Sequence, residues 1–225
     1  MTDLAIIVPS RHRPASIGAL LKSFGDTHTT SDLIVVLDDD DEYFQDYLNL
    51  DFRANDQLMV IPRVGKGMAR PLNIAADLLK DSYRHFAFMG DDHRPRTLNW
   101  DRKFIEALDG VDAGIVYGDD LLQGANLATA CAMSGAIVRQ LGGMVPPGMI
   151  HMYLDNFWMK LGNDLGALIY LPDVILEHLH PVAGKAEMDE LYATVNNDEV
   201  MNADRLAFES YIASEGYCEL LGALK

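Results

Sequence analysis

The chain has 225 residues, of which 49% are hydrophobic and 23% charged, a composition typical of a globular domain rather than of a disordered chain. Its apolar runs are all shorter than the roughly 20 residues that cross a bilayer, and its first residues lack the basic start and apolar stretch of a signal peptide. The formal net charge of −16 disfavours tight non-specific binding to nucleic acids and anionic membranes. We therefore expect a cytoplasmic protein with no membrane partner, in which Cys131 and Cys218 stay free thiols. The alternative interpretation of the acidity is that it only keeps the protein soluble.

Short apolar runs alternate with helical patterns over the first 120 residues. Apolar spacing at i, i+3, i+4 and i+7 predicts helices from Pro14 to Phe24 and around Leu72 to Leu79. This alternation predicts an α/β fold, in which a mainly parallel sheet is covered by helices on both faces. The runs are too short for helices and predict five buried strands at Leu4–Pro9, Leu33–Leu37, Leu58–Ile61, His85–Met89 and Ala113–Tyr117.

The second half of the chain is less regular. Extended segments are predicted at Ala128–Ala132 and Leu168–Leu176, and helices at Met152–Leu161 and Ala203–Ser214. Glycines and prolines between residues 142 and 148 predict a loop. Because no linker, repeat or low-complexity tract interrupts the chain, we expect a single domain.

Polar side chains follow three of the predicted strands. They are Ser10–Arg13 after the first strand, Asp38–Asp41 after the second and Gly90–His93 after the fourth. Ligands bind at the carboxyl ends of the strands in parallel sheets, so these clusters are expected along one edge.

Two acidic and two histidine side chains are candidate metal ligands. The adjacent carboxylates of Asp91 and Asp92 must repel or share a cation, and Mg²⁺ or Mn²⁺ suits carboxylates together with diphosphate oxygens. The alternative is that they cap a helix beginning near Thr97. His178 and His180 alternate onto one face of an extended segment. They are either metal ligands or phosphate contacts, or else structural histidines.

Two basic clusters precede predicted helices. Arg11 and Arg13 lead into the first, where free backbone N–H groups and guanidinium donors together favour an anion. Lys66 and Arg70 flank the start of another helix, without the spacing of a P-loop or a dinucleotide fingerprint. The alternative is that the arginines are only solvent-exposed.

Asp155 stands among apolar and aromatic residues, in the run Tyr153–Trp158. Such surroundings raise the pKa of a carboxyl and suit it to act as a general base. The alternative is that Asp155 is the N-cap of the helix that begins there.

Together these segments resemble the GT-A glycosyltransferases, in particular the inverting family 2 type. Ile7–Pro14 resembles the opening V-P-[ST]-x-N-R-P of that group, with His12 in place of the usual Asn. Leu37–Asp39 is similar to its V-D-D strand end, and Gly67–Asn73 to its G-x-x-x-A-x-N helix start. Phe88–Asp92 resembles the strand that leads into its D-x-D metal motif.

The resemblance implies a Rossmann-like GT-A domain that transfers a sugar from a nucleotide-diphosphate sugar to an acceptor hydroxyl, with inversion and with Mn²⁺ or Mg²⁺ as cofactor. Residues 1–120 would bind the nucleotide sugar, residues 121–181 would form the acceptor and catalytic half, and residues 182–225 would be a C-terminal helical extension. Asp38 would contact the base, for which uridine is expected, and Asp155 would be the catalytic base. The expected donor contacts are Pro9, Arg11, Arg13, Asp38, Lys66, Arg70, Asp91 and Asp92.

The metal motif departs from the family pattern, because Gly90 stands where the first acid of D-x-D usually lies. Asp92 is therefore the expected metal ligand, while the role of Asp91 and an Asp91-x-His93 variant of the motif stay open. By the same resemblance we expect a histidine ligand, His178 in preference to His180.

The chain is also similar to small glycosyltransferases encoded by bacteriophages. That similarity suggests a hydroxymethylated DNA base or a virion protein as acceptor, in a host cytoplasm. The acceptor is expected to contact the variable segment between Tyr117 and Met149, with Gly118–Gly124 and Met133–Gly135 as walls of its pocket. The oligomeric state stays open. Two alternatives remain: a sugar-activating nucleotidyltransferase, whose usual glycine-rich loop is missing from Ser10–Pro14, and a non-catalytic nucleotide-sugar-binding module, which would not need Asp155.

Overall fold

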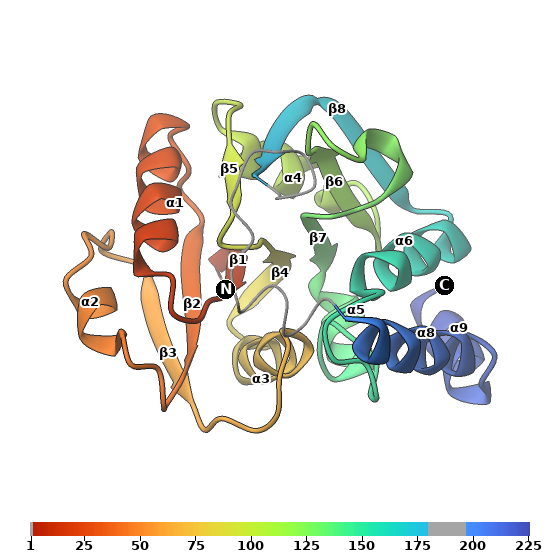
Figure 1. Ribbon diagram of the computed structural model, residues 1–225. Coiled ribbons are helices and arrows are strands. Elements are labelled where there is room, and N and C mark those ends of the chain that lie inside the picture. Colours follow the sequence, from red (N-terminus) through yellow and green to blue (C-terminus); the bar gives the residue numbers. More distant parts are fainter. Residues whose placement is uncertain (1, 180–196) are drawn as a thin grey trace.

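A computed structural model describes residues 2–179 and 197–225, and a twisted eight-stranded sheet forms its centre (Figure 1). The strand order is β3-β2-β1-β4-β7-β6-β8-β5. The β1–β2, β2–β3, β1–β4 and β6–β8 pairs are parallel, and the other three pairs are antiparallel. This confirms the predicted α/β fold with a mainly parallel sheet. The strands are β1 Thr2–Pro9, β2 Asp32–Asp38, β3 Gln57–Ile61, β4 Tyr83–Phe88, β5 His93–Pro95, β6 Ile115–Asp119, β7 Cys131–Ser134 and β8 Leu168–His178.

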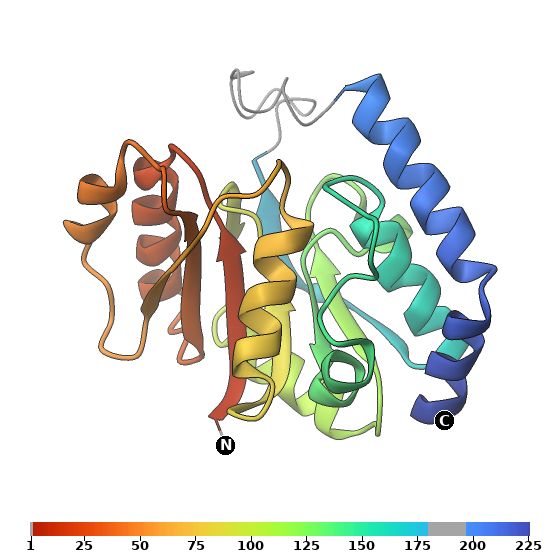
Figure 2. The ribbon, with the colours of Figure 1, turned by 90° about the horizontal axis from the view of Figure 1, so that it is seen from below.

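Helices cover both faces of the sheet (Figures 1 and 2). One face carries α1 Pro14–Asp26, α2 Phe44–Leu48 and α4 Trp100–Asp109. The other carries α3 Ala69–Leu79, α5 Gly135–Leu141, α6 Leu154–Leu165, α8 Asp198–Ile212 and α9 Glu215–Leu224. No helix within residues 2–179 and 197–225 has the length and apolar character needed to cross a membrane.

Alternate residues of the central strands enter two separate cores. Leu4, Ile6 and Val8 of β1 pack on the side of α1 and α4, whereas Ala5 and Ile7 pack on the side of α3 and α6. A strand buried on both faces needs apolar residues at every position, which is why β1 and β2 were recognisable as continuous apolar runs.

Several elements differ from the sequence-based expectation. The strand expected at Ala128–Ala132 is β7, which begins later, at Cys131. The helix expected from Ala203 begins at Asp198, where the side chain of Asn197 caps it by accepting a hydrogen bond from the Val200 N–H at 3.0 Å. The elements β5 and α2 have three and five residues, too few to show a hydrophobic period.

The carboxyl ends of β1, β2 and β4 meet at one edge of the sheet. The register pairs Pro9 with Val36 and Ile7 with Phe88. The three polar clusters that follow these strands are therefore neighbours, as the fold class predicted.

A buried carboxylate ties α4 to the segment before β2. Asp101 is fully buried, and its Oδ2 accepts hydrogen bonds from the N–H and hydroxyl groups of Thr30 and Ser31, at 2.8 to 3.2 Å. Replacing Asp101 by Ala would leave buried donors without an acceptor. The free energy of unfolding should fall by about 3 kcal/mol, measured by urea denaturation. The exposed Asp112→Ala variant is the matched control, and equal stability of the two variants would contradict this role.

Candidate active site

A cavity of about 440 Å³ opens at the carboxyl edge of the sheet, within the size range of small-molecule sites. The ends of β1, β2 and β4 line it, together with residues of the 63–71 and 122–129 segments, the start of α6 and the end of β8. His180 lies outside the described residues. All other residues expected to contact the donor, hold the metal or act as the base line this one cavity: Pro9, Arg11, Arg13, Asp38, Lys66, Arg70, Asp91, Asp92, Asp155 and His178.

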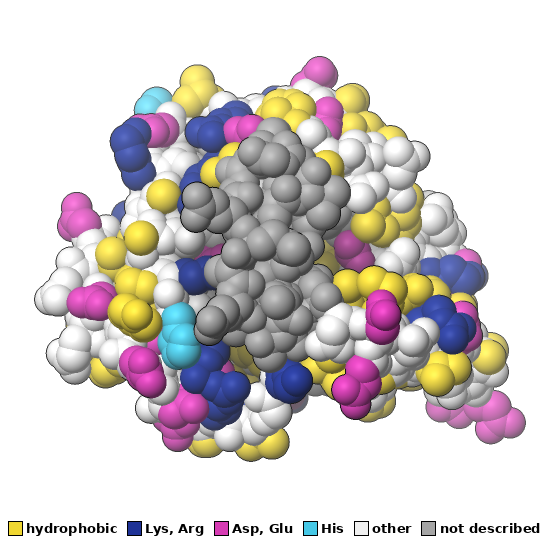
Figure 3. All heavy atoms as spheres, viewed as in Figure 1, with side chains coloured by type: hydrophobic (Ala, Val, Ile, Leu, Met, Phe, Trp, Pro, Cys, Tyr) yellow, Lys and Arg dark blue, Asp and Glu magenta, His cyan; other side chains and the backbone are white. Residues whose placement is uncertain are grey.

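Positive side chains gather around the cavity although the chain is strongly acidic. On the face viewed in Figure 3, some Lys and Arg side chains lie near the middle and others toward the rim, and acidic ones are scattered over it. Five cations line the cavity together with the carboxylates of Asp38, Asp91, Asp92 and Asp155. Positive side chains are thus more frequent there than in the whole chain of net charge −16, which favours an anionic ligand. The lining cations are Arg11, Arg13, Arg63, Lys66 and Arg70.

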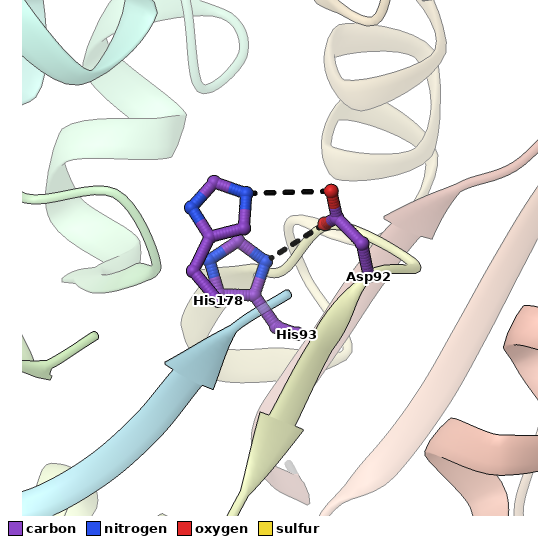
Figure 4. A group of neighbouring side chains, drawn as sticks. All are labelled: Asp92, His93 and His178. Carbon is purple, nitrogen blue, oxygen red and sulfur yellow. Dashed lines mark ion pairs between the residues drawn. The ribbon is translucent and has the colours of Figure 1, made fainter. Parts of the chain in front are cut away.

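Asp92, His93 and His178 form a compact cluster in the cavity (Figure 4). Asp92 Oδ1 lies 3.2 Å from His93 Nδ1, and Asp92 Oδ2 lies 3.3 Å from His178 Nε2. The two imidazole rings stack with centroids 4.1 Å apart. One donor atom from each residue falls within 4.8 Å of the others, so the three side chains are close enough to bind one ion together.

The pairing of β5 with β8 creates this cluster. These strands run antiparallel with His93 opposite His178, and the Leu179 N–H donates to the Asp92 carbonyl at 3.0 Å. Gly90 makes room for it, because a Cβ there would lie 2.6 Å from Asp92 Oδ1 and 2.9 Å from His93 Nδ1. The glycine that breaks the expected D-x-D pattern thus allows the turn to bring Asp92 and His93 together.

The cluster has the chemistry of a metal site. His93 is only 2% exposed, and its Nε2 has no hydrogen-bond partner within the described part of the chain. Burial, and the neighbouring His178, lower the pKa of His93, which favours the neutral ring that binds metals. Burial opposes the ionisation of Asp92, but its contacts with His178 and His93 lower its pKa well below the usual range. Two imidazoles and one carboxylate suit Mn²⁺ better than the oxygen-preferring Mg²⁺.

Asp91 points away from this cluster despite being next to Asp92. Its carboxylate accepts hydrogen bonds from Ser10 Oγ at 2.7 Å and from Arg13 Nη1 at 3.4 Å. Burial raises the pKa of Asp91 to about 6, and Arg13 acts in the opposite sense. Since β5 separates both acids from α4, which begins at Trp100, neither acid caps that helix. The structure therefore brings His93, rather than Asp91, together with Asp92.

Asp155 lies in the first turn of α6 and lines the cavity. The N-cap of this helix is Tyr153, and the Asp155 carboxylate accepts a hydrogen bond from the adjacent Asn156 N–H at 3.0 Å. The capping alternative is therefore not what the structure shows. Burial raises the pKa of Asp155, as expected for a carboxyl group in apolar surroundings.

Asp120 shapes the part of the cavity wall that the 122–129 segment forms. Its sequence context does not reveal this role. Its Oδ1 accepts the N–H groups of Leu122, Gln123 and Gly124 at 2.7 to 3.0 Å, and its Oδ2 accepts Thr129 Oγ1 at 2.8 Å. This carboxylate fixes the loop from which Leu122, Gln123, Leu127 and Thr129 reach the cavity.

The second segment expected in the acceptor wall, Met133–Gly135, lies elsewhere, so that expectation was wrong. Ser134 pairs with His85 near the start of β4, at the opposite edge of the sheet. The antiparallel direction of β7 carries this segment away from the carboxyl ends of β1 and β4.

His12 occupies the position at which the resembling family usually has Asn. Its backbone is left-handed, with φ 56°, a conformation that Asn, Asp and His adopt more readily than other residues with a side chain. The His12 N–H donates to Asp41 Oδ2 at 2.9 Å. Nearby, Arg11 Nη1 lies 3.1 Å from Asp38 Oδ2 and 2.6 Å from Asp40 Oδ1. The turn after β1 is therefore held against the acidic segment after β2.

Comparison with known proteins gives likeness in fold alone. No protein-family model matches the chain, and no curated protein matches it in sequence. Glucosyl-3-phosphoglycerate synthase of Mycobacterium tuberculosis, solved with Mn²⁺, UDP-glucose and glycerol 3-phosphate, is similar with a TM-score of 0.60 and 14% identity, over 92% of this chain and 80% of that one. A candidate nucleotide-diphospho-sugar transferase of Desulfovibrio desulfuricans G20 has a TM-score of 0.55 and 11% identity, over 98% and 97% of the two chains. A candidate glucose-1-phosphate thymidylyltransferase of Bacillus anthracis has a TM-score of 0.54 and 10% identity, over 86% and 99%.

The geometry of the cluster predicts which side chains bind a divalent ion. Asp92→Asn, His93→Gln and His178→Gln should each weaken Mn²⁺-dependent binding of UDP by at least tenfold, or about 1.4 kcal/mol, in isothermal titration calorimetry. His85→Gln is the matched control, because His85 is also buried but lies near the start of β4. Wild-type affinity in His93→Gln would remove His93 from the site, and wild-type affinity in all three variants would refute it.

Proposed function

We propose that this chain is a metal-dependent glycosyltransferase that moves a sugar from a UDP-sugar to an acceptor hydroxyl, with inversion at the anomeric carbon. The observation that carries the proposal is the Asp92–His93–His178 cluster inside a cavity lined by five cations. A divalent ion and several cationic side chains in one cavity suit a diphosphate, because its oxygens can bind the ion while its negative charge attracts the side chains. The fold is that of proteins that handle nucleotide sugars.

Asp92, His93 and His178 would hold Mn²⁺, which when bound neutralises the charge that develops on the leaving diphosphate. Lys66 lies just before α3 and Arg70 lies in its first turn, and both side chains line the cavity. Lys66 is exposed and forms no ion pair with any described residue, so its charge is available to a phosphate. Arg13 contributes from the turn after β1.

Asp38 supports recognition of the nucleobase. It ends β2, remains partly exposed in the cavity and is held by Arg11 at 3.1 Å. The ion pair orients the carboxylate, so that it can accept a hydrogen bond from an N–H group such as that of uracil.

Asp155 is the group that would remove the acceptor proton. It lies in the same cavity as the cluster, and the segment held by Asp120 lines that cavity as well. Between them is room for an acceptor hydroxyl, for which the resemblance to phage enzymes suggests a hydroxymethylated DNA base or a virion protein. As this hydroxyl attacks the anomeric carbon from the side opposite the diphosphate, Asp155 accepts its proton and the configuration inverts.

The assignment of Asp38 predicts a preference among nucleotides. In competition for the Mn²⁺-loaded protein, UDP should bind more tightly than GDP, dTDP and CDP, and Asp38→Asn should reduce the difference between UDP and GDP. Asp46→Asn, on α2 and outside the cavity lining, controls for the change in charge. Binding of GDP tenfold tighter than UDP, about 1.4 kcal/mol, would contradict this assignment.

The assignment of Asp155 predicts a defect in rate rather than in donor binding. With water as the acceptor, Asp155→Asn should release UDP from UDP-glucose at least about 100-fold more slowly, with unchanged affinity for UDP and unchanged melting temperature. Because burial raises the pKa of Asp155, the wild-type rate should fall on acidification above the usual titration range of Asp, and this limb should vanish in Asp155→Asn.

Asp164→Asn, later on the same helix and outside the cavity lining, is the control for that experiment. A near-normal rate in Asp155→Asn would leave the chain without an identified base, whereas no release of UDP by the wild-type chain would favour a non-catalytic binding module. Consumption of a nucleoside triphosphate with a sugar phosphate would instead identify a nucleotidyltransferase.

A further inference from the structure

The helix α8 contacts the wall of the cavity through one buried carboxylate. Asp204 is fully buried; its Oδ1 accepts the Ile150 N–H at 2.7 Å, and its Oδ2 accepts the N–H groups of His151 and Met152 at 2.8 and 2.6 Å. Three charge-assisted hydrogen bonds to successive backbone N–H groups fix a segment that belongs to no helix or strand. Figure 2 shows α8 running along the outside of the layer that contains α6.

The segment held by Asp204 is part of the cavity wall. His151, Met152 and Tyr153 line the cavity, and Asp155 follows directly. On its other side the Ile150 carbonyl accepts the Ala69 N–H at 3.0 Å. Gly67 packs so tightly there that a Cβ on it would lie 2.3 Å from that carbonyl oxygen. Residues 150–152 are therefore held between α8 and the segment that carries Lys66 and Arg70.

His151 is a polar group of this wall to which the proposed reaction gives no role. The charges of Asp204, Arg13 and Asp92 all act on its ring, and His151 lines the same cavity as Arg13 and Asp92. Its Nδ1 is buried and has no hydrogen-bond partner in the part of the chain that the structure describes. A buried imidazole nitrogen without a partner is costly unless a ligand supplies one.

The protonation state of His151 indicates the kind of ligand group. Burial lowers its pKa to about 4, so the ring is neutral near pH 7. A neutral imidazole donates one hydrogen bond and accepts one, which matches a hydroxyl group, whereas phosphates are better served by the cations already present. A nucleotide sugar carries hydroxyls on either side of its diphosphate, on the ribose and on the donor sugar. Because His151 lies four residues before the candidate base Asp155, the donor sugar is the side that His151 would contact.

We propose that His151 hydrogen-bonds a hydroxyl of the donor sugar, and that Asp204 of α8 is the positioning residue that holds His151 in place. This inference rests on the proposed function and adds the residue that senses the sugar. It also makes α8 part of the site, where the resemblance had left residues 182–225 as an extension.

The first test compares a ligand with and without the sugar. With Mn²⁺ present, His151→Ala should weaken binding of UDP-glucose about tenfold and binding of UDP by less than about twofold. Equal weakening of both ligands would assign His151 to the UDP part that they share and would overturn the sugar contact. Unchanged binding of UDP-glucose would also overturn it. If the wild-type chain binds neither ligand, the proposed function itself fails, which distinguishes the two claims.

The second test asks whether Asp204 acts through His151. Asp204→Asn keeps an acceptor oxygen for part of the segment, and should lower the affinity ratio of UDP-glucose to UDP in the same direction as His151→Ala. The double variant should lose no more of this ratio than the weaker-binding single variant, because both changes remove one contact. Additive losses would contradict a positioning role. Glu209→Gln, on the same helix but exposed, should leave the ratio unchanged; a comparable loss there would also overturn the role of Asp204.

Discussion

The antiparallel pairing of β5 with β8 is the constraint on which the site depends. It sets His93 opposite His178, and the turn before β5 brings Asp92 against both rings. A carboxylate beside the edges of two stacked imidazoles satisfies part of the polar requirement of a buried group, while His93 Nε2 keeps no partner among the described residues. The residual demand for a partner is what makes the cluster suited to a cation. A side chain at Gly90 would prevent this approach, so the turn and the donor set belong together.

Charge then orders the rest of the cavity around that cluster. The arginines that enter it are held by carboxylates, Arg11 by Asp38 and Asp40 and Arg13 by Asp91. Such pairs orient the guanidinium groups and reduce their mutual repulsion, but they weaken the attraction of these groups for an anion. The diphosphate of the proposed donor would restore that attraction by bringing several negative charges at once. The acidic remainder of the surface makes the cavity the place where an anion is favoured.

The sequence predicted the parts of this arrangement that leave a local signal. The strands β1, β2, β4 and β6 were recognisable because burial on both faces requires apolar residues throughout, and the parallel topology followed from their alternation with helices. The strand β3 was also expected to be buried, but it lies at the edge of the sheet, with Gln57 and Val60 exposed. That reasoning also brought Arg11, Asp38 and Asp92 to one edge, where the structure has them.

What the sequence could not predict depends on contacts between distant segments. The three-residue β5 is too short to show a hydrophobic period, so the sequence did not predict that His93 lies opposite His178. The antiparallel direction of β7, which was not predicted either, carries Met133–Gly135 to the edge of the sheet opposite the cavity. Asp120 and Asp204 look like ordinary acidic residues. Their roles come from backbone N–H groups, which in the case of Asp204 lie more than 50 residues away in the chain.

The central claim is that a divalent ion and a nucleotide sugar bind this cavity together. Thermal unfolding of the full chain, with a panel of UDP-, GDP- and dTDP-sugars in the presence and absence of Mn²⁺, tests it most directly. We predict that a UDP-sugar raises the melting temperature only when Mn²⁺ is present, since a ligand at 100 times its Kd stabilises the folded state by about 2.7 kcal/mol. The same shift should be lost in Asp92→Asn. Equal stabilisation without Mn²⁺, or none by any nucleotide sugar, would contradict the account.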